Sequence, residues 1–143
     1  MKLDCYVDAY FAVLWKHEDD KDSVCVKSRT GHFINIGGFP LYWVSKLQTE
    51  TALSNLETEY IDLSQDMRDL LNLRKLIQEF GTQFNVGFES PTVIHCAVFE
   101  DKNCSLILAT SPQKTPRTRH IAVKYHFFRE NIGEGKGVMI QRV

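Results

Sequence analysis

Three acidic residues that lie far apart in the chain are placed as a carboxylate metal site would require. Asp8 interrupts an apolar stretch typical of a buried strand, and Asp101 follows a second such stretch. Glu59 falls in the second turn of a long predicted helix. If the two strands are neighbours, ligands gather where the strands end, and the helix can bring Glu59 to the same point. Converging carboxylates repel one another unless cations neutralise them, and such oxygen ligands suit Mg²⁺ or Mn²⁺.

The helix that would carry Glu59 is the most regular pattern in the sequence. Between Ser54 and Gly81, apolar residues recur at steps of three and four, so they share one face. These residues are Leu56, Tyr60, Leu63, Met67, Leu70, Leu73, Ile77 and Phe80. Ser54 with Glu57 has the form of a capping box, and Gly81 is placed to end the helix. Glu59 borders the stripe, so it is either an acid stabilised by the helix dipole or a ligand for a cation.

The remaining elements complete an α/β pattern around this helix. Three strand-like stretches before the helix indicate an antiparallel meander, and a fourth strand, a short helix-like run, an amphipathic helix and a last strand follow. The expected ranges are 3–15, 31–38 and 39–48 for the first three strands, 91–100 for the fourth, 117–131 for the amphipathic helix and 133–143 for a glycine-rich turn and the last strand. The order β-β-β-α-β-α-α-β predicts one α/β domain that spans residues 1–143.

Composition narrows the class of protein. The chain has 143 residues, of which 43% are hydrophobic and 24% charged, as in soluble globular domains. No apolar run approaches the roughly 18 residues that a membrane span needs, and the first residues lack the apolar core of a signal peptide. The four cysteines form no CxxC pair, which favours reduced thiols inside a cell, although an even count also permits disulfides.

The charge is unevenly distributed along the chain. The net charge is −1, but residues 112–143 carry seven Lys and Arg against two Glu, and the preceding part is acidic. A basic segment of this kind favours contact with a polyanion, and a solvated basic face without a partner is equally compatible.

Three ordered stretches carry the most specific pattern: YVDAYFA (6–12), GFPLYWVSKLQTETALSNLETEYIDLS (38–64) and TPRTRHIAVKYHFFRE (115–130). Together they resemble the ribonuclease H domain of copia-type retrotransposon polyproteins, over essentially the whole chain. The resemblance implies a ribonuclease H-like fold, with a five-stranded mixed sheet of three antiparallel and then two parallel strands, flanked by helices. Family members continue into a helix that carries a further acidic ligand, so we expect a C-terminally truncated domain in which that helix is missing.

The resemblance also implies a chemistry. Asp8, Glu59 and Asp101 match the catalytic acids of the family, which bind two Mg²⁺ or Mn²⁺ ions. The implied reaction is endonucleolytic cleavage of the RNA strand of an RNA–DNA hybrid during reverse transcription, beside a reverse transcriptase domain of the same polyprotein. The implied location is the cytoplasm, in a retroelement particle, or the nucleus. The candidates for phosphate contacts in the basic segment are Arg117, Arg119, Lys124 and Arg129.

The stretch around the third acid departs from the family pattern and leaves alternatives open. The family has an asparagine after its third acid, where this sequence has Lys102, and a gapless alignment would put that acid on Ala97 instead of Asp101. A catalytically silent domain that binds nucleic acid is therefore the second interpretation. A zinc site is the third, although neither the spacing of His120 and His126 nor that of Cys96 and Cys104 is typical of zinc ligand pairs.

Overall fold

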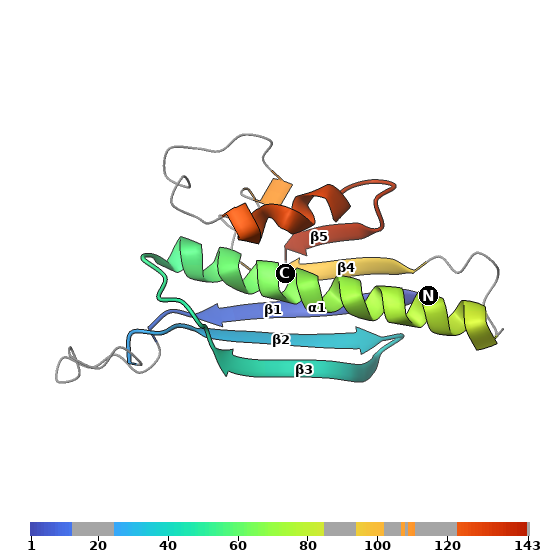
Figure 1. Cartoon of the computed structure of the whole chain (residues 1–143), viewed down its shortest axis with the longest axis horizontal. Helices are drawn as coiled ribbons and strands as arrows, with labels where there is room; N and C mark the ends of the chain where they lie inside the picture. The colour runs from blue at the N-terminus through green and yellow to red at the C-terminus, as the bar shows by residue number, and fades with distance from the viewer. Residues whose placement is uncertain (13–24, 85–93, 102–106, 108, 111–122, 143) are drawn as a thin grey trace.

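One long helix lies along one face of a five-stranded sheet (Figure 1). The computed structural model describes residues 1–12, 25–84, 94–101, 107, 109–110 and 123–142. The elements are β1 (Lys2–Tyr10), β2 (Arg29–Ile36), β3 (Phe39–Leu47), α1 (Asn55–Phe84), β4 (His95–Glu100), the 3-10 helix η2 (Val123–Asn131) and β5 (Val138–Arg142). In the part of the chain that these ranges cover, no helix is long and apolar enough to cross a membrane.

The sheet has the mixed topology that the sequence predicts. Its strand order is β3-β2-β1-β4-β5. β1, β2 and β3 pair antiparallel, whereas β4 pairs parallel with both β1 and β5. The hairpin between β2 and β3 turns at Gly37 and Gly38, whose φ angles of 56° and 88° favour residues without a Cβ atom. The parallel join between β1 and β4 places the two halves of the chain side by side.

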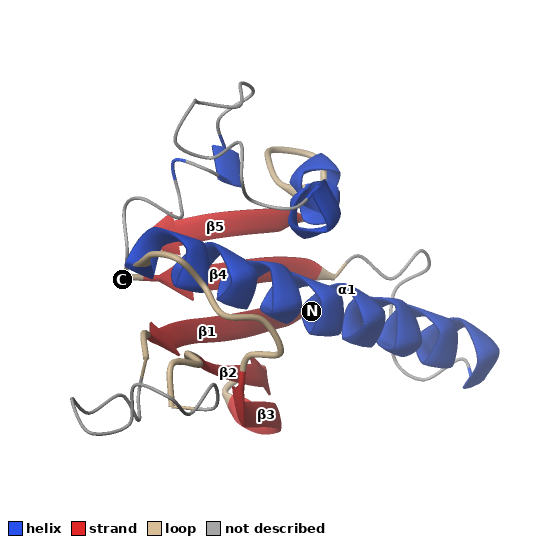
Figure 2. Cartoon of the chain, turned by 60° about the vertical axis from the view of Figure 1, so that its left-hand side comes forward, coloured by secondary structure: helices blue, strands red, loops and turns tan. Residues whose placement is uncertain are grey.

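The hydrophobic core fills the space between α1 and the sheet. Alternate residues of β1, beginning with Leu3 and Cys5, face the helix and are buried. The helix contributes residues from its first half, such as Leu63 and Met67, and η2 beside it contributes Phe128 (Figure 2). Every one of these side chains is fully buried, so the first half of α1 is packed against β1 and η2.

An aromatic row crosses the other face of the sheet. The strand registers align Trp43 of β3 with Phe33 of β2, Tyr6 of β1 and Phe99 of β4. Tyr6 and Phe99 stack with ring centroids 4.8 Å apart, and Trp43 is 69% exposed. Asp8 lies on this face of β1, because it is two residues from Tyr6.

The capping prediction for α1 is confirmed at its start and wrong at its end. The Ser54 hydroxyl accepts the Glu57 backbone N–H at 3.2 Å, and the Glu57 carboxylate accepts the Leu53 N–H at 2.7 Å. The helix does not end at Gly81, which lies buried inside it, but continues to Phe84. Phe80 is 53% exposed, because a helix of 30 residues is roughly 45 Å long and projects beyond strands of about 30 Å (Figure 2).

Other predicted elements also differ from the structure. β1 ends at Tyr10, and Ala12 then adopts a φ of 45° in a turn, so the strand does not reach residue 15 as we expected. β4 begins at His95, and residues 91–93 lie outside the described residues. The expected amphipathic helix is a 3-10 helix over its described part, which begins at Val123.

Candidate metal centre

Three carboxylates meet at the edge of the sheet where β4 ends. Glu59, Glu100 and Asp101 each contribute a carboxylate oxygen, and these atoms all lie within 4.8 Å of one another. We call these three residues the edge group. Two of its members were candidates from the sequence, and Glu100 was not. The structure thus brings Glu59 and Asp101 together from positions more than forty residues apart.

Local structure explains how the edge group is assembled. The Ser54 cap fixes the first turn of α1, so Glu59 sits in the second turn over the end of β4. In β4, side-chain alternation places Glu100 on the same face as Cys96 and Val98, beneath the helix. Asp101, which follows, is exposed, whereas Glu59 and Glu100 are buried. The edge group therefore has a buried floor and one ligand that reaches solvent.

The edge group is electrostatically suited to a divalent cation. Two negative charges 4.8 Å apart repel by about 3–4 kcal/mol at the effective dielectric constant of a protein surface. A cation between them reverses the sign of this energy. The group offers only carboxylate oxygens, the ligands that Mg²⁺ and Mn²⁺ prefer, and contains neither the histidine nor the cysteine that zinc favours. These residues therefore fit the predicted cofactor.

Asp8 lies outside the edge group. It is exposed on the face of the sheet opposite α1 and pairs with Gly31 of β2. The parallel register pairs Tyr6 with Phe99, so two further steps along both strands would bring Asp8 level with Asp101. Its role as a metal ligand stays a prediction.

One candidate for phosphate contact is held by the helix that carries Glu59. Arg129 in η2 donates from Nε to the Tyr60 hydroxyl at 2.9 Å, and that hydroxyl also lies 2.7 Å from Nδ1 of His126. Burial raises the pKa of Tyr60, and the hydrogen bond from Arg129 acts in the opposite direction. This hydrogen-bonded set joins η2 to α1 one residue beyond Glu59.

The other basic and zinc candidates are only partly described. Arg117 and Arg119 lie outside the described residues, and of Lys124 only the backbone is placed, within η2. His120 and Cys104 of the zinc interpretation also lie outside the described residues. His126 contacts Tyr60, which gives it a packing role.

A second acidic group, which lies between α1 and the sheet, was not identified from the sequence. Asp62 and Asp66 of α1 are fully buried against Thr30 and His32 of β2, and we call these four residues the buried strip. The Asp66 carboxyl contacts Nδ1 of His32, whose Nε2 lies 3.3 Å from Asp69. The signal was available, because Asp62 and Asp66 follow Thr58 at helical spacing and Thr30 and His32 alternate in β2.

Burial changes the protonation of this strip. It is the main cause that raises the pKa of Asp62 to about 10, with repulsion from Asp66 second. Burial also raises the pKa of Asp66, followed by repulsion from Glu100, and burial lowers the pKa of His32. These directions favour the protonated form of the two acids and the neutral form of the imidazole.

Comparisons with known proteins point to one family. No family model matches this chain. It is 32% identical over 108 residues to a retrovirus-related Pol polyprotein from transposon TNT 1-94 of Nicotiana tabacum, a match that covers 76% of the chain. It is 30% identical over 135 residues to a Pol polyprotein from transposon RE2 of Arabidopsis thaliana, which covers 94%. The chain spans only 8% of the length of either relative.

A solved structure supports the fold independently. The structure of LC11-RNase H1, isolated from compost, matches with a TM-score of 0.58. The match covers 99% of this chain and 84% of that chain at 17% sequence identity. At this identity the likeness establishes a shared fold, and the five-stranded sheet confirms the predicted topology.

Proposed function

We propose, from the premise that this chain is a ribonuclease H-like domain related to the Pol polyproteins of copia-type transposons, that it hydrolyses the RNA strand of RNA–DNA hybrids with bound divalent cations. The observation that carries this proposal is the edge group, in which Glu59, Glu100 and Asp101 converge. Mg²⁺ or Mn²⁺ is the cofactor, and two ions are expected.

The roles of the residues follow from their positions. Glu59 and Glu100 form the buried floor that holds a cation in place, and Asp101 closes the site on the solvent side. Asp8 supplies a further oxygen ligand from the neighbouring strand. When bound, the ions lower the pKa of the attacking water and stabilise charge on the leaving 3′ oxygen. The substrate is read by duplex shape and 2′-hydroxyl groups more than by sequence.

One observation favours a second candidate function. Because Asp8 lies outside the edge group, the chain as described brings only two of the three predicted acids together. A domain that binds nucleic acid without cleaving it does not need the complete set of three acids. In either case, the other domains of the same polyprotein, including a reverse transcriptase domain, are the proposed protein partners.

A cleavage assay separates the two candidates. The purified chain is incubated with an end-labelled RNA–DNA hybrid in Mg²⁺ or Mn²⁺, beside Glu59→Gln, Asp101→Asn and Asp8→Asn. We expect cleavage that falls at least about 100-fold in Glu59→Gln and Asp101→Asn, because each removes a charged cation ligand. Glu79→Gln is the matched control, since Glu79 is an exposed acid of α1 that pairs with Lys75. Cleavage that survives Glu59→Gln would refute the proposed site, and salt-sensitive binding without any cleavage would establish the second candidate.

A further inference from the structure

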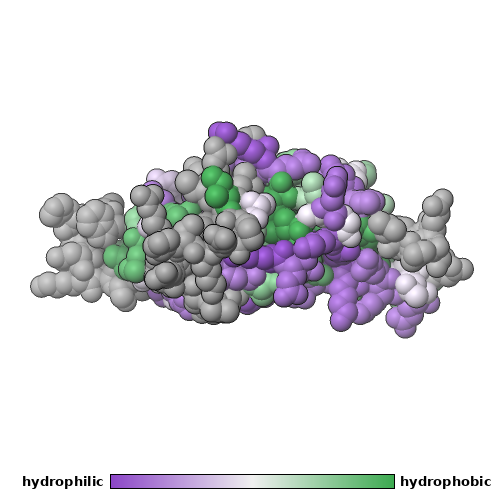
Figure 3. Space-filling model, turned by 90° about the horizontal axis from the view of Figure 1, so that it is seen from above, coloured by the Kyte–Doolittle hydropathy of each residue, from purple (hydrophilic) through white to green (hydrophobic). Residues whose placement is uncertain are grey.

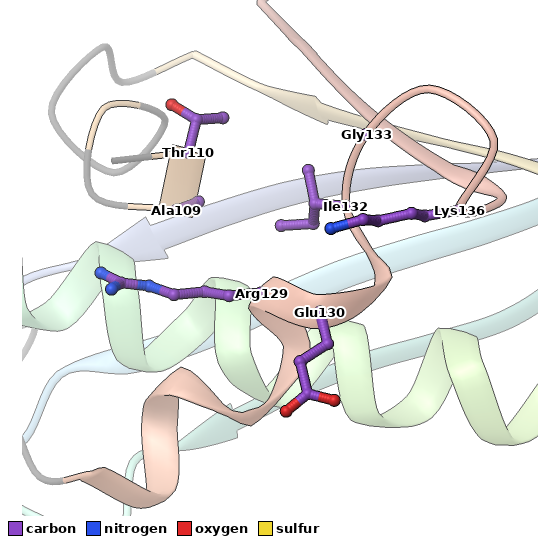
Figure 4. Close-up of a pocket in the computed structure, with 7 residues that line it drawn as sticks. All are labelled: Ala109, Thr110, Arg129, Glu130, Ile132, Gly133 and Lys136. Atoms are coloured by element: carbon purple, nitrogen blue, oxygen red, sulfur yellow. The ribbon is translucent and has the colours of Figure 1, made fainter. Parts of the chain in front are cut away.

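A cavity of about 480 Å³ opens between Ala109–Thr110, the end of η2 and the turn that follows η2 (Figure 4). Its volume is that of a typical ligand site. Arg129, Ile132 and Lys136 line it, so cationic groups sit beside aliphatic ones. The cavity lies apart from the edge group, none of whose members lines it.

The charge of the cavity favours an anion. Lys136 extends across the cavity toward Ile132, whereas the Glu130 carboxylate points away from Thr110 and Lys136 in Figure 4. Among the described residues, no carboxylate forms an ion pair with Lys136. Figure 3 shows this side from above, where hydrophilic and apolar residues both reach the described surface. An ammonium group in such surroundings is a natural partner for a phosphate oxygen.

The turn that carries Lys136 is held in place before any ligand arrives. The Gly133 N–H donates to the Val138 carbonyl at 3.0 Å, and the Lys136 N–H donates to the Gly133 carbonyl at 3.1 Å. Gly137 has a φ of 93°, and the guanidinium of Arg74 occupies the space that a Cβ atom there would need. Arg74 also donates to the Lys136 carbonyl at 3.5 Å, so α1 fixes the turn and adds a third cation near it. A fixed turn lowers the entropy cost of binding.

The second cation of the cavity is tied to the helix that carries the edge group. Arg129 donates to the Tyr60 hydroxyl, and its guanidinium lies 5.7 Å from the centre of the Tyr60 ring. Tyr60 follows Glu59 in α1. A backbone phosphate held in the cavity would therefore have a fixed position relative to the carboxylates.

We propose that this cavity binds a phosphate of the nucleic-acid backbone away from the bond that is cut, with Lys136 and Arg129 as its cationic contacts. This inference rests on the proposed function and names the subsite that sets the register of the strand. Phosphate contacts position a nucleic acid without reading its sequence, so the subsite contributes affinity and register.

Binding in the absence of cleavage tests the subsite. The full chain with Glu59→Gln is titrated with a fluorescent RNA–DNA hybrid in EDTA at several salt concentrations, with and without Lys136→Gln. We expect Lys136→Gln to weaken binding several-fold at low salt and to reduce the slope of log K against log salt by about one. Lys136→Glu should weaken binding further, since it adds repulsion. Lys75→Gln is the matched control, because Lys75 is an exposed lysine of α1 that already pairs with Glu79.

The outcomes distinguish this inference from the proposed function. If Lys136→Gln and Lys136→Glu bind like Lys75→Gln while the wild-type chain still cleaves, the subsite is wrong and the function stands. If the wild-type chain neither binds nor cleaves hybrid, both fail. A free nucleoside triphosphate could instead displace the hybrid at micromolar concentration, and Lys136→Gln could abolish this displacement. That result would assign the cavity to a free nucleotide and overturn the proposal. Circular dichroism of each variant confirms that it is folded.

Discussion

The edge group and the buried strip both contain acids from the first four turns of α1, yet their negative charge is accommodated in different ways. Glu59 meets Glu100 and Asp101 at the end of β4, where one carboxylate is exposed and a cation can enter. Asp62 and Asp66 lie between α1 and β2, where burial raises the pKa of each carboxyl. The same residue type thus forms the proposed cation site at the rim of the sheet and a buried acid with a raised pKa under it. The difference follows from access to solvent, which is open at the edge group and closed at the buried strip.

The largest expected effect comes from the residue of the edge group that the sequence did not indicate. Glu100→Gln should reduce cleavage of RNA–DNA hybrid at least about 100-fold, because it removes a buried carboxylate from the proposed cation site. Cleavage rates in Mg²⁺ and calorimetric Mg²⁺ titrations check this together. If Glu100→Gln cleaves and binds Mg²⁺ like Glu79→Gln, Glu100 belongs to the protein interior only and the edge group is smaller than we describe.

The buried strip should appear in the pH dependence of stability. The folded state keeps a proton on Asp62 up to a pKa of about 10, whereas the unfolded chain releases it near the ordinary value of 3.8. Stability should therefore be greatest below about pH 4 with respect to this group and fall as the pH rises toward 10, by up to about 1.4 kcal/mol per pH unit. Asp62→Asn, neutral at every pH, should flatten this slope, as urea unfolding at pH 5, 7 and 9 would show. An unchanged slope in Asp62→Asn would mean that Asp62 is ionised in the folded protein.

Adding Mg²⁺ should separate the two acidic groups by their effect on thermal stability. A ligand at ten times its Kd stabilises the folded state by about 1.4 kcal/mol, so the melting temperature should rise by several degrees. Asp101→Asn should lose this rise, whereas Asp62→Asn should retain it. Calorimetry with Mg²⁺ and with Na⁺ of equal ionic strength measures both. A rise that disappears in Asp62→Asn would place a cation in the buried strip instead.

The smallest expected effect concerns the cap that positions Glu59. Ser54→Ala removes the acceptor of the Glu57 N–H and should cost about 1 kcal/mol of folding free energy. Cleavage should fall only a few-fold, since the buried residues of α1 still hold the second turn. Ser54→Asp, which can accept the same hydrogen bond, is the matched control and should restore both stability and rate. A loss in Ser54→Ala as large as in Glu59→Gln would show that the cap itself shapes the edge group.

Local patterns predicted the elements better than their ends. The Ser54–Glu57 pattern identified the start of α1, because a cap is a local hydrogen-bond arrangement. Gly81 did not end the helix, since one glycine inside a helix costs only about 1 kcal/mol and its lack of a side chain suits a buried position. The mixed strand order followed from the family resemblance, because parallel pairing of β1 with β4 depends on contacts that no local pattern encodes.

The sequence indicated two of the three residues of the edge group. Glu59 stood out because it borders an apolar stripe, and Asp101 because it ends a strand. Glu100 was overlooked although Cys96, Val98 and Glu100 alternate onto one face of β4. The buried strip was overlooked because only apolar residues were counted in the helical pattern of α1. Polar residues that share a face with buried apolar residues, in β4 and in α1, indicate both Glu100 and the buried strip.

The central position of β1 in the sheet means that the edge group is completed late along the chain. Translation delivers β1, β2, β3 and α1 before β4, whose first residue is His95. The strands of the hairpin and the helix are close in sequence, whereas the pairing of β1 with β4 closes a long stretch of chain, which costs more chain entropy. Glu59 is therefore synthesised before Glu100 and Asp101, the other two residues of the edge group. The edge group is therefore complete only after β4 and Asp101 have been synthesised.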